Sequence, residues 1–257
     1  MDATDRRQPR EIAIPALVHR HGGKLYGLGL RLCGGPEDAE DLVQETFLRA
    51  YRNWEQFEGR SDPGTWLYSI ASRVCQRLHR RRAGEPSRIG SIDELLPMGD
   101  RELAVIEGGA DMMISKEGIE QVERAMTTLP IQFRMPLVLK DIVGLSIADV
   151  AEILGIKPAT VKTRVHRARL KLRQAVEELL PRRELPPAAY SKQVCLDLLR
   201  AKQEALDRGI AMRDEVVCDR CMALFATMDL TREYCEEIGR GELPDELREA
   251  LLAQTSA

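Results

Sequence analysis

The sequence predicts an all-α fold, with two small helical domains joined by a flexible linker and followed by a small C-terminal helical domain. Apolar residues recur at helical spacing almost throughout the 257-residue chain, and only 4% of the residues are aromatic. Glycine and proline gather in two stretches, which divide the helical segments. The predicted boundaries are 13–82 and 116–181 for the two domains, 83–115 for the linker and 190–257 for the C-terminal domain.

The net charge of −3 says little about partners, because acidic and basic residues are segregated along the chain. The sequence has no run of about 18 apolar residues and no secretory leader pattern, which predicts a soluble cytoplasmic protein with no membrane association. In that compartment, the six cysteines are expected to be free thiols or metal ligands rather than disulfides.

The first predicted domain contains an acidic helix followed by a basic one. The acidic helix begins at Pro36 and continues towards Trp54, and the basic helix follows Trp66 and is rich in arginine. A basic helix beside aromatic rings predicts a nucleic-acid surface, where the rings could stack on unpaired bases. Core packing is the alternative role for each tryptophan.

The second predicted domain contains a helix-turn-helix within residues 146–173. Gly155 follows the last apolar residue of the first helix, where a left-handed cap is expected, and Pro158 suits the first turn of the next helix. That second helix buries one apolar stripe and carries no acidic residue before Glu177. It therefore predicts a DNA-reading helix in the major groove. Its candidate DNA contacts are Lys162, Thr163, Arg164, His166, Arg167 and Arg169.

The residues that carry these two patterns resemble a known family. Residues 38–82 (DAEDLVQETF to LHRRR) resemble the second region of bacterial sigma factors of the extracytoplasmic-function (ECF) type, and residues 129–173 resemble their fourth region. The resemblance implies a factor that directs RNA polymerase core to promoters and helps to open them. The same fourth-region helix would then read the minus-thirty-five element.

The resemblance also assigns roles to the first domain. The acidic helix would bind the beta-prime clamp of RNA polymerase core, where charge complementarity speeds docking. The residues implied are Asp38, Asp41, Gln44 and Glu45, with Leu42 helping to form the core or the interface. The loop and the basic helix that follow would hold a flipped base of the minus-ten element. The residues implied there are Arg60, Ser61, Asp62, Arg73, Gln76, Arg77 and Arg80.

The C-terminal domain is an extension beyond a minimal member of this family. It has 14 acidic and 9 basic residues from Tyr190 onwards and holds four of the six cysteines, two of them in a CxxC pair. Its sequence resembles the zinc-binding fold of anti-sigma factors, with Asp214 where that pattern has a histidine. One interpretation is a zinc site of Cys195, Cys218 and Cys221, with Asp214 or Cys235 as the fourth ligand.

Geometry disfavours Cys235 if the helix after Cys221 is unbroken, because fourteen residues then span roughly 21 Å. A second interpretation is a redox switch, in which Cys218 and Cys221 form a disulfide. Cys33 and Cys75 are better explained as buried free thiols, each alone on an apolar helical face.

The expected function is therefore that of a sigma factor whose acidic extension covers a DNA surface or the polymerase-binding face, with metal or thiol state governing release. The opposite role, an extension required for activity, is also open. A separate anti-sigma factor is a further candidate partner. The sequence shows no phosphate-binding loop, nucleophile elbow or paired-carboxylate setting, so no enzyme is expected. The alternative function is a dimeric helix-turn-helix regulator that binds operators without polymerase.

Overall fold

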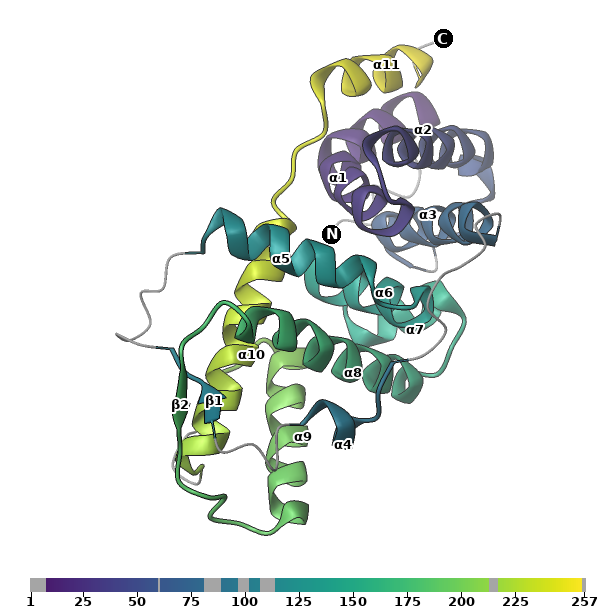
Figure 1. Cartoon of the computed structure of the whole chain (residues 1–257). Coiled ribbons are helices and arrows are strands. Elements are labelled where there is room, and N and C mark those ends of the chain that lie inside the picture. Colours follow the sequence, from purple (N-terminus) through teal and green to yellow (C-terminus); the bar gives the residue numbers. More distant parts are fainter. Residues whose placement is uncertain are drawn as a thin grey trace. The chain divides into compact units, whose positions relative to one another are not determined.

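The computed structural model describes residues 8–59, 61–80, 89–96, 102–106, 114–212 and 217–255. Within these ranges the chain is helical, as predicted, apart from one pair of three-residue strands (Figure 1). The chain divides into two compact units, and each unit is made of segments that are not contiguous in the sequence. The first unit is drawn from residues 1–85, 138–158 and 238–257, and the second from residues 86–137 and 159–237.

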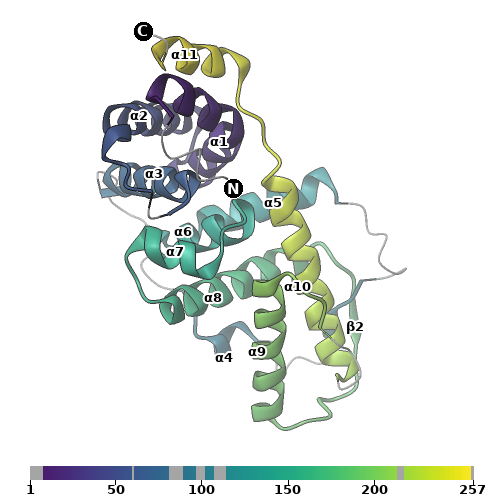
Figure 2. The same ribbon diagram turned by 180° about the vertical axis from the view of Figure 1, so that it is seen from behind.

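The first unit is built on three long helices, α1 (Arg10–Cys33), α2 (Pro36–Asn53) and α3 (Pro63–Arg80), with a short turn η2 (Trp54–Gln56) after α2. Gly29 of α1 lets α2 approach closely, since a Cβ there would lie 2.8 Å from Ala39. The wide turn η3 (Val138–Ile142) packs on α1, and α7 (Ile147–Leu154) packs on α3. The last helix, α11 (Asp245–Thr255), lies against α1 and α2, as Figure 2 shows.

The second unit contains α4 (Ile92–Leu95), α5 (Lys116–Thr127), α6 (Ile131–Leu137), α8 (Pro158–Glu177), α9 (Lys192–Arg208) and α10 (Asp219–Ile238). Strands β1 (Glu102–Ala104) and β2 (Arg182–Glu184) form an antiparallel pair, with Leu103 opposite Arg183. This pair was not predicted, because each strand is too short to show a period of two in its sequence.

Two described stretches of the predicted flexible linker, residues 89–96 and 102–106, pack against other elements of the second unit. Leu95 and Leu96 are buried in a core cluster with Leu170 of α8 and with residues of α9 and α10. The main-chain carbonyl of Leu95 also accepts a hydrogen bond from Arg173. Apolar side chains and carbonyls in this stretch thus find partners on α8, and residues 89–96 and 102–106 are part of the second unit.

The extension also differs from a separate C-terminal domain. In the cluster just described, Leu170 packs with Cys195, Leu199 and Leu206 of α9 and with Phe225 of α10. Helices α9 and α10 are therefore part of the core around α8, whereas α11 belongs to the first unit. The boundary that the sequence predicts between the second domain and the C-terminal domain, at residues 181–190, stays a prediction.

Two further sequence expectations concern buried thiols and the membrane. Cys33 and Cys75 are buried, as expected, but they are not alone, because their sulfur atoms lie 3.8 Å apart between α1 and α3. Among the described residues, no helix is both long and apolar enough to cross a bilayer.

Candidate nucleic-acid and polymerase interfaces

Local capping fixes the two helices of the predicted helix-turn-helix. Ser146 and Asp149 form a capping box at the start of α7, in which the Asp149 amide donates to Ser146 Oγ at 3.1 Å. Gly155 ends α7 with φ of 64°, which confirms the predicted left-handed cap. Helix α8 begins at Pro158, also as predicted. The sequence therefore sets the start of the recognition helix within one residue.

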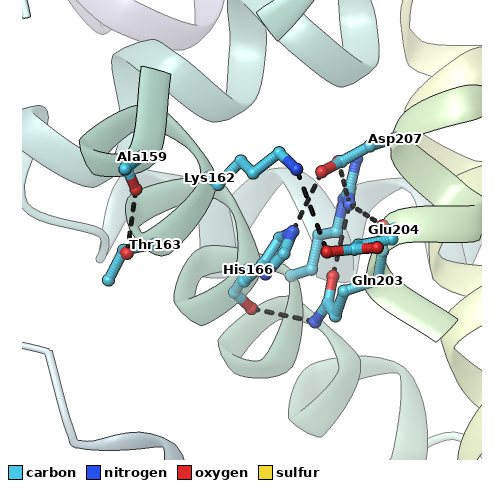
Figure 3. Close-up of polar contacts among 8 residues, drawn as sticks. Ala159, Lys162, Thr163, His166, Gln203, Glu204 and Asp207 are labelled. Atoms are coloured by element: carbon cyan, nitrogen blue, oxygen red, sulfur yellow. Dashed lines mark hydrogen bonds and ion pairs between the residues drawn. The ribbon is translucent and has the colours of Figure 1, made fainter. Parts of the chain in front are cut away.

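Helix α8 has one apolar face, as predicted, and its basic residues emerge elsewhere. Four residues of the predicted stripe are fully buried: Val161, Val165, Ala168 and Leu172. The basic face, however, is not free. Helix α9 lies beside it within the second unit (Figure 3) and presents Gln203, Glu204 and Asp207 to it.

Asp207 is the centre of this contact. Its Oδ1 accepts a hydrogen bond from Arg169 Nη1 at 2.7 Å. Its Oδ2 lies 3.0 Å from His166 Nε2, as Figure 3 shows. The side chain of Asp207 is only 6% exposed and that of Arg169 only 7%. Burial alone would raise the pKa of Asp207, but the hydrogen bond from His166 and the charge of Arg169 outweigh it and lower the pKa. Asp207 is thus an ionised, buried partner for two predicted DNA-binding residues.

Gln203 and Glu204 extend the contact along α8. The amide nitrogen of Gln203 donates to the carbonyl of His166 at 3.2 Å, and its Oε1 accepts from Arg169 at the same distance. Glu204 lies 3.9 Å from the Lys162 ammonium in a half-exposed ion pair. Three candidates on α8, namely Lys162, His166 and Arg169, therefore have side-chain partners on α9.

Arg167 is held by the linker instead. Its guanidinium donates to the carbonyls of Ile89 at 2.6 Å and Gly90 at 2.8 Å, and it lies 5.1 Å from the centre of the Phe133 ring. The other two candidates are less constrained. Thr163 is exposed and donates to the carbonyl of Ala159, and Arg164 is half-buried.

The acidic helix α2 presents most of its predicted polymerase-binding residues. Asp41 is exposed, and Asp38, Gln44 and Glu45 are partly exposed, with Glu45 paired to Arg49 at 2.5 Å. Leu42 is the exception, and of the two roles implied for it the structure favours the core over the interface. It is completely buried, so it belongs to the core of the helical bundle and presents no atoms to a partner.

The predicted minus-ten surface lies on the loop before α3 and on α3 itself. Asp62 is exposed and its Oδ1 accepts from the Gly64 amide at 2.7 Å, while Ser61 is half-buried. Three candidates on α3 are exposed: Arg73, Gln76 and Arg77. Arg60 and the side chain of Arg80 lie outside the described residues.

The two tryptophans pack together near this loop. The ring of Trp54 lies 5.9 Å from that of Trp66 and 5.4 Å from that of Phe57. The indole nitrogen of Trp54 donates to the carbonyl of Gln8 at 2.9 Å. Trp54 is 8% exposed, so it has the core role that was weighed for it.

The thiols of the extension meet where α9 and α10 begin. Cys221 makes thiol contacts with both Cys218 and Cys195, and all three line a small cavity of about 40 Å³. Burial, together with these neighbours, raises the pKa of Cys221 to about 12. For Cys218, burial would raise the pKa, but hydrogen bonds from the backbone of Ala189, Cys221 and Arg220 and from the Cys221 thiol outweigh it and lower the pKa. The CxxC pair is thus strongly asymmetric.

The described residues do not by themselves assemble a metal site in this arrangement. Among the described residues, no group of three or more His, Cys, Asp or Glu side chains has the geometry to hold a metal ion. Helix α10 is unbroken from Asp219 to Ile238, which leaves Cys235 roughly 21 Å from Cys221 and removes it as a ligand. Asp214 lies outside the described residues.

Sequence reasoning missed the partners of α8, namely Gln203, Glu204 and Asp207. A signal was present, since these residues occur at positions i, i+1 and i+4 of one helix in an acidic segment, and so share a face. Nothing local specified which surface that face would meet.

Comparison with known proteins matches both domains. A model of sigma-70 region 2 matches residues 17–85, and one of sigma-70 region 4 matches residues 119–172. The ECF RNA polymerase sigma factor SigW of Bacillus subtilis is 34% identical over 171 residues, which cover 65% of this chain and 90% of that protein. The chain belongs to the ECF family of RNA polymerase sigma factors.

Another relative and a solved structure also match the chain. The ECF sigma factor SigE of Mycolicibacterium smegmatis is 36% identical over 63% of this chain, which spans 62% of that relative's length. The structure of CnrH in complex with the cytosolic domain of CnrY aligns with 68% of this chain and 94% of that one, at 24% identity and a TM-score of 0.49, too low for a comparison of details.

Membership of this family establishes the general function of the chain. This sigma factor directs RNA polymerase to promoters as a non-enzymatic DNA-binding protein, and it is not an operator-binding regulator independent of polymerase. The family-model matches end at residue 172, so α9, α10 and α11 lie beyond them.

Proposed function

We propose that the C-terminal extension of this sigma factor restrains promoter recognition in cis by holding the recognition helix α8 against α9. The observation that carries the proposal is the position of Asp207 between His166 and Arg169. Binding to duplex DNA depends on cations that neutralise phosphates and on side chains that reach base edges. Cations already paired with carboxylates of the same chain are not available for either.

The proposal assigns the remaining roles as the resemblance implied. The exposed carboxylates of α2 contact the polymerase clamp, α3 contacts the minus-ten element, and the residues of α8 contact the minus-thirty-five element once α9 leaves. A separate anti-sigma factor remains a candidate partner. The charge of the extension supports restraint over the opposite role, because its carboxylates pair with the same cations that DNA would need.

Point substitutions test this better than removal of the extension. A chain that ends at Leu180 would lose α9 and α10, and with them the core that buries Leu170. The test variant is Glu204→Gln with Asp207→Asn, which removes two charges from the contact and keeps the side-chain shapes. Asp197→Asn is the matched control, because Asp197 is exposed on the same helix and pairs with Arg200 rather than α8.

The readouts are run-off transcription with purified core polymerase on promoter fragments from the producing cell, and binding to a random 30-base-pair duplex at several salt concentrations. Restraint predicts more transcript and tighter binding for the double variant, with a salt slope that steepens by about 0.9 for each additional phosphate that the protein neutralises. The control should match the wild type. Hydrogen exchange verifies that α9 is released; a released α9 with less transcript than the wild type overturns restraint in favour of an activating role.

The same proposal includes a thiol switch where α9 and α10 begin. Cys218 is the only cysteine of the described residues that is not buried, and its pKa is lowered, which favours the reactive thiolate. With hydrogen peroxide, the Cys218 thiolate attacks one oxygen and the O–O bond breaks, giving a sulfenic acid and hydroxide. The Cys221 thiol then displaces water and closes a disulfide. Because Cys221 also contacts Cys195, bond formation changes the packing at the first turn of α9.

Peroxide titration of the full chain tests the switch. We expect a Cys218–Cys221 disulfide by peptide mass spectrometry and faster amide exchange in α9, both abolished by Cys218→Ser. An oxidised pair with unchanged exchange in α9 contradicts the coupling. Zinc binding by Cys195, Cys218, Cys221 and Asp214 stays a separate prediction, for which the metal content of protein purified with and without added zinc is the measurement.

A further inference from the structure

The last helix, α11, packs within the first unit through an apolar stripe. Leu247 and Leu251 of this helix lie four residues apart and are 5% and 1% exposed, and Leu243, just before the helix, is 5% exposed. Their partners are α1 and α2, which α11 covers in both views of the chain (Figures 1 and 2). A stripe of this kind indicates a specific docking contact made by one face of α11. Residues 241–255 are called the strap below.

Two adjacent glycines of α1 shape the surface beneath the strap. A Cβ at Gly22 would lie 2.8 Å from Leu243 Cδ2, and a Cβ at Gly23 would lie 2.8 Å from the carbonyl oxygen of Gly241. Both distances are shorter than carbon contacts allow, so any larger residue would push the strap away. The absence of side chains at these positions lets the strap backbone approach α1 directly.

The far end of the strap reaches the predicted polymerase-binding residues. Gln254 lines a hollow of about 440 Å³ together with Asp41, Gln44 and Glu45 of α2. Arg77 of α3, a minus-ten candidate, lines the same hollow. A stable protein–protein interface buries about 800 Å² on each partner. A protein that binds α2 at this hollow would therefore also contact α11.

We propose that the strap closes the polymerase-binding face of region 2 in cis, and that core polymerase binds fully only after the strap is displaced. This inference rests on the proposed role of Asp41, Gln44 and Glu45. It is independent of the contact between α9 and α8, because α11 belongs to the first unit and α9 to the second. The chain thus carries one restraint for each of its two interfaces.

The restraint follows from simple population arithmetic. If only a fraction of molecules has the strap released, the apparent affinity for core polymerase falls by that fraction. A strap tethered to its own binding face also has a high effective concentration, so weak contacts suffice. Releasing the strap should therefore raise the affinity for core polymerase without any change in the residues of α2.

One variant releases the strap from beneath. Gly23→Ala places a methyl group against the main chain of Gly241, which cannot rotate away as a side chain can. The matched control is Gly27→Ala in the same helix, where a Cβ would meet only the mobile guanidinium end of Arg31 at 3.3 Å. Both changes raise the helix propensity of α1 equally, so a difference between them reports the strap.

A second variant pins the strap in place. A Cβ at Gly22 would lie 3.8 Å from Leu243 Cβ, which is the usual separation in a disulfide. Gly22→Cys with Leu243→Cys should therefore lock the strap under oxidation and release it under reduction. The wild-type chain under the same oxidant controls for the native cysteines.

Binding of full-length chains to purified core polymerase decides the question. We expect Gly23→Ala to bind at least about tenfold tighter than Gly27→Ala, and the oxidised pinned variant to bind at least about tenfold weaker than its reduced form. If hydrogen exchange shows a released strap in Gly23→Ala but binding is unchanged, or if the pinned form binds normally, the strap proposal is overturned. If Asp41→Lys leaves binding intact in every background, the proposed polymerase face is wrong instead.

Discussion

Asp207 and Arg169 form a buried ion pair between α9 and the recognition helix, with 2.7 Å between Oδ1 and Nη1. Removing one partner of such a pair leaves the other charge buried, which costs about 3 to 5 kcal/mol, whereas replacing both with apolar residues can be nearly neutral. We therefore expect Asp207→Asn to lower the free energy of unfolding, and Arg169→Met with Asp207→Leu to restore most of it. Urea unfolding of the wild type, the single variants Arg169→Met and Asp207→Leu, and the double variant measures the coupling, and purely additive effects would contradict the pairing.

The same pair makes the contact sensitive to acid. The pKa of Asp207 is lowered in the folded chain, so its contribution to stability is complete above the unfolded value of about 4 and is lost as the pH falls through the lowered folded value. At about pH 5, where the Asp207 carboxylate is ionised in the folded and in the unfolded chain, wild type should be more stable than Asp207→Asn. Unfolding titrations at lower pH should then show the two converge. A difference that grows on acidification would mean that the pKa is raised.

The cysteines of the CxxC pair should react at different rates. Cys218 is partly exposed and has a lowered pKa, whereas Cys221 is 6% exposed and has its pKa raised to about 12. Since the thiolate is the nucleophile, iodoacetamide should modify Cys218 first at neutral pH and leave Cys221 largely unmodified. Peptide mapping over time gives both rates. Equal rates at the two sites would contradict the opposite pKa shifts of the two thiols.

Gly118 should resist substitution although it lies in a helix. An alanine there would place its Cβ well inside van der Waals contact of the Tyr234 hydroxyl and ring, and Tyr234 is buried between α5 and α10. Overpacking of this kind costs about 1 to 3 kcal/mol, which exceeds the helix propensity gain of about 1 kcal/mol. Thermal unfolding should show Gly118→Ala below the wild type. Tyr234→Leu should relieve the clash, so the alanine change should cost less in that background.

Much of the helical framework could be predicted from the sequence because its signals are local. Helix α2 begins at the predicted Pro36, and α7 and α8 have the caps that Gly155 and Pro158 indicated. The linker was less predictable. Its apolar pair Leu95 and Leu96 shows no periodicity, and its burial depends on a surface formed by α8, α9 and α10. Leu42 illustrates the same limit, because its place in the acidic helix did not tell a core position from an interface position.

The sequence by itself determined the helices, the distribution of charge along them and the membership of the ECF sigma factor family. These depend on residues within one or two turns of each other, or on motifs that occur in a fixed order. Only the tertiary structure decided that Arg169 faces Asp207, and that α11 lies on α1 and α2. The partner of Arg169 is 38 residues away. A basic side chain carries the same local signal whether it binds a phosphate or a carboxylate, so only the packing of distant helices selects between them.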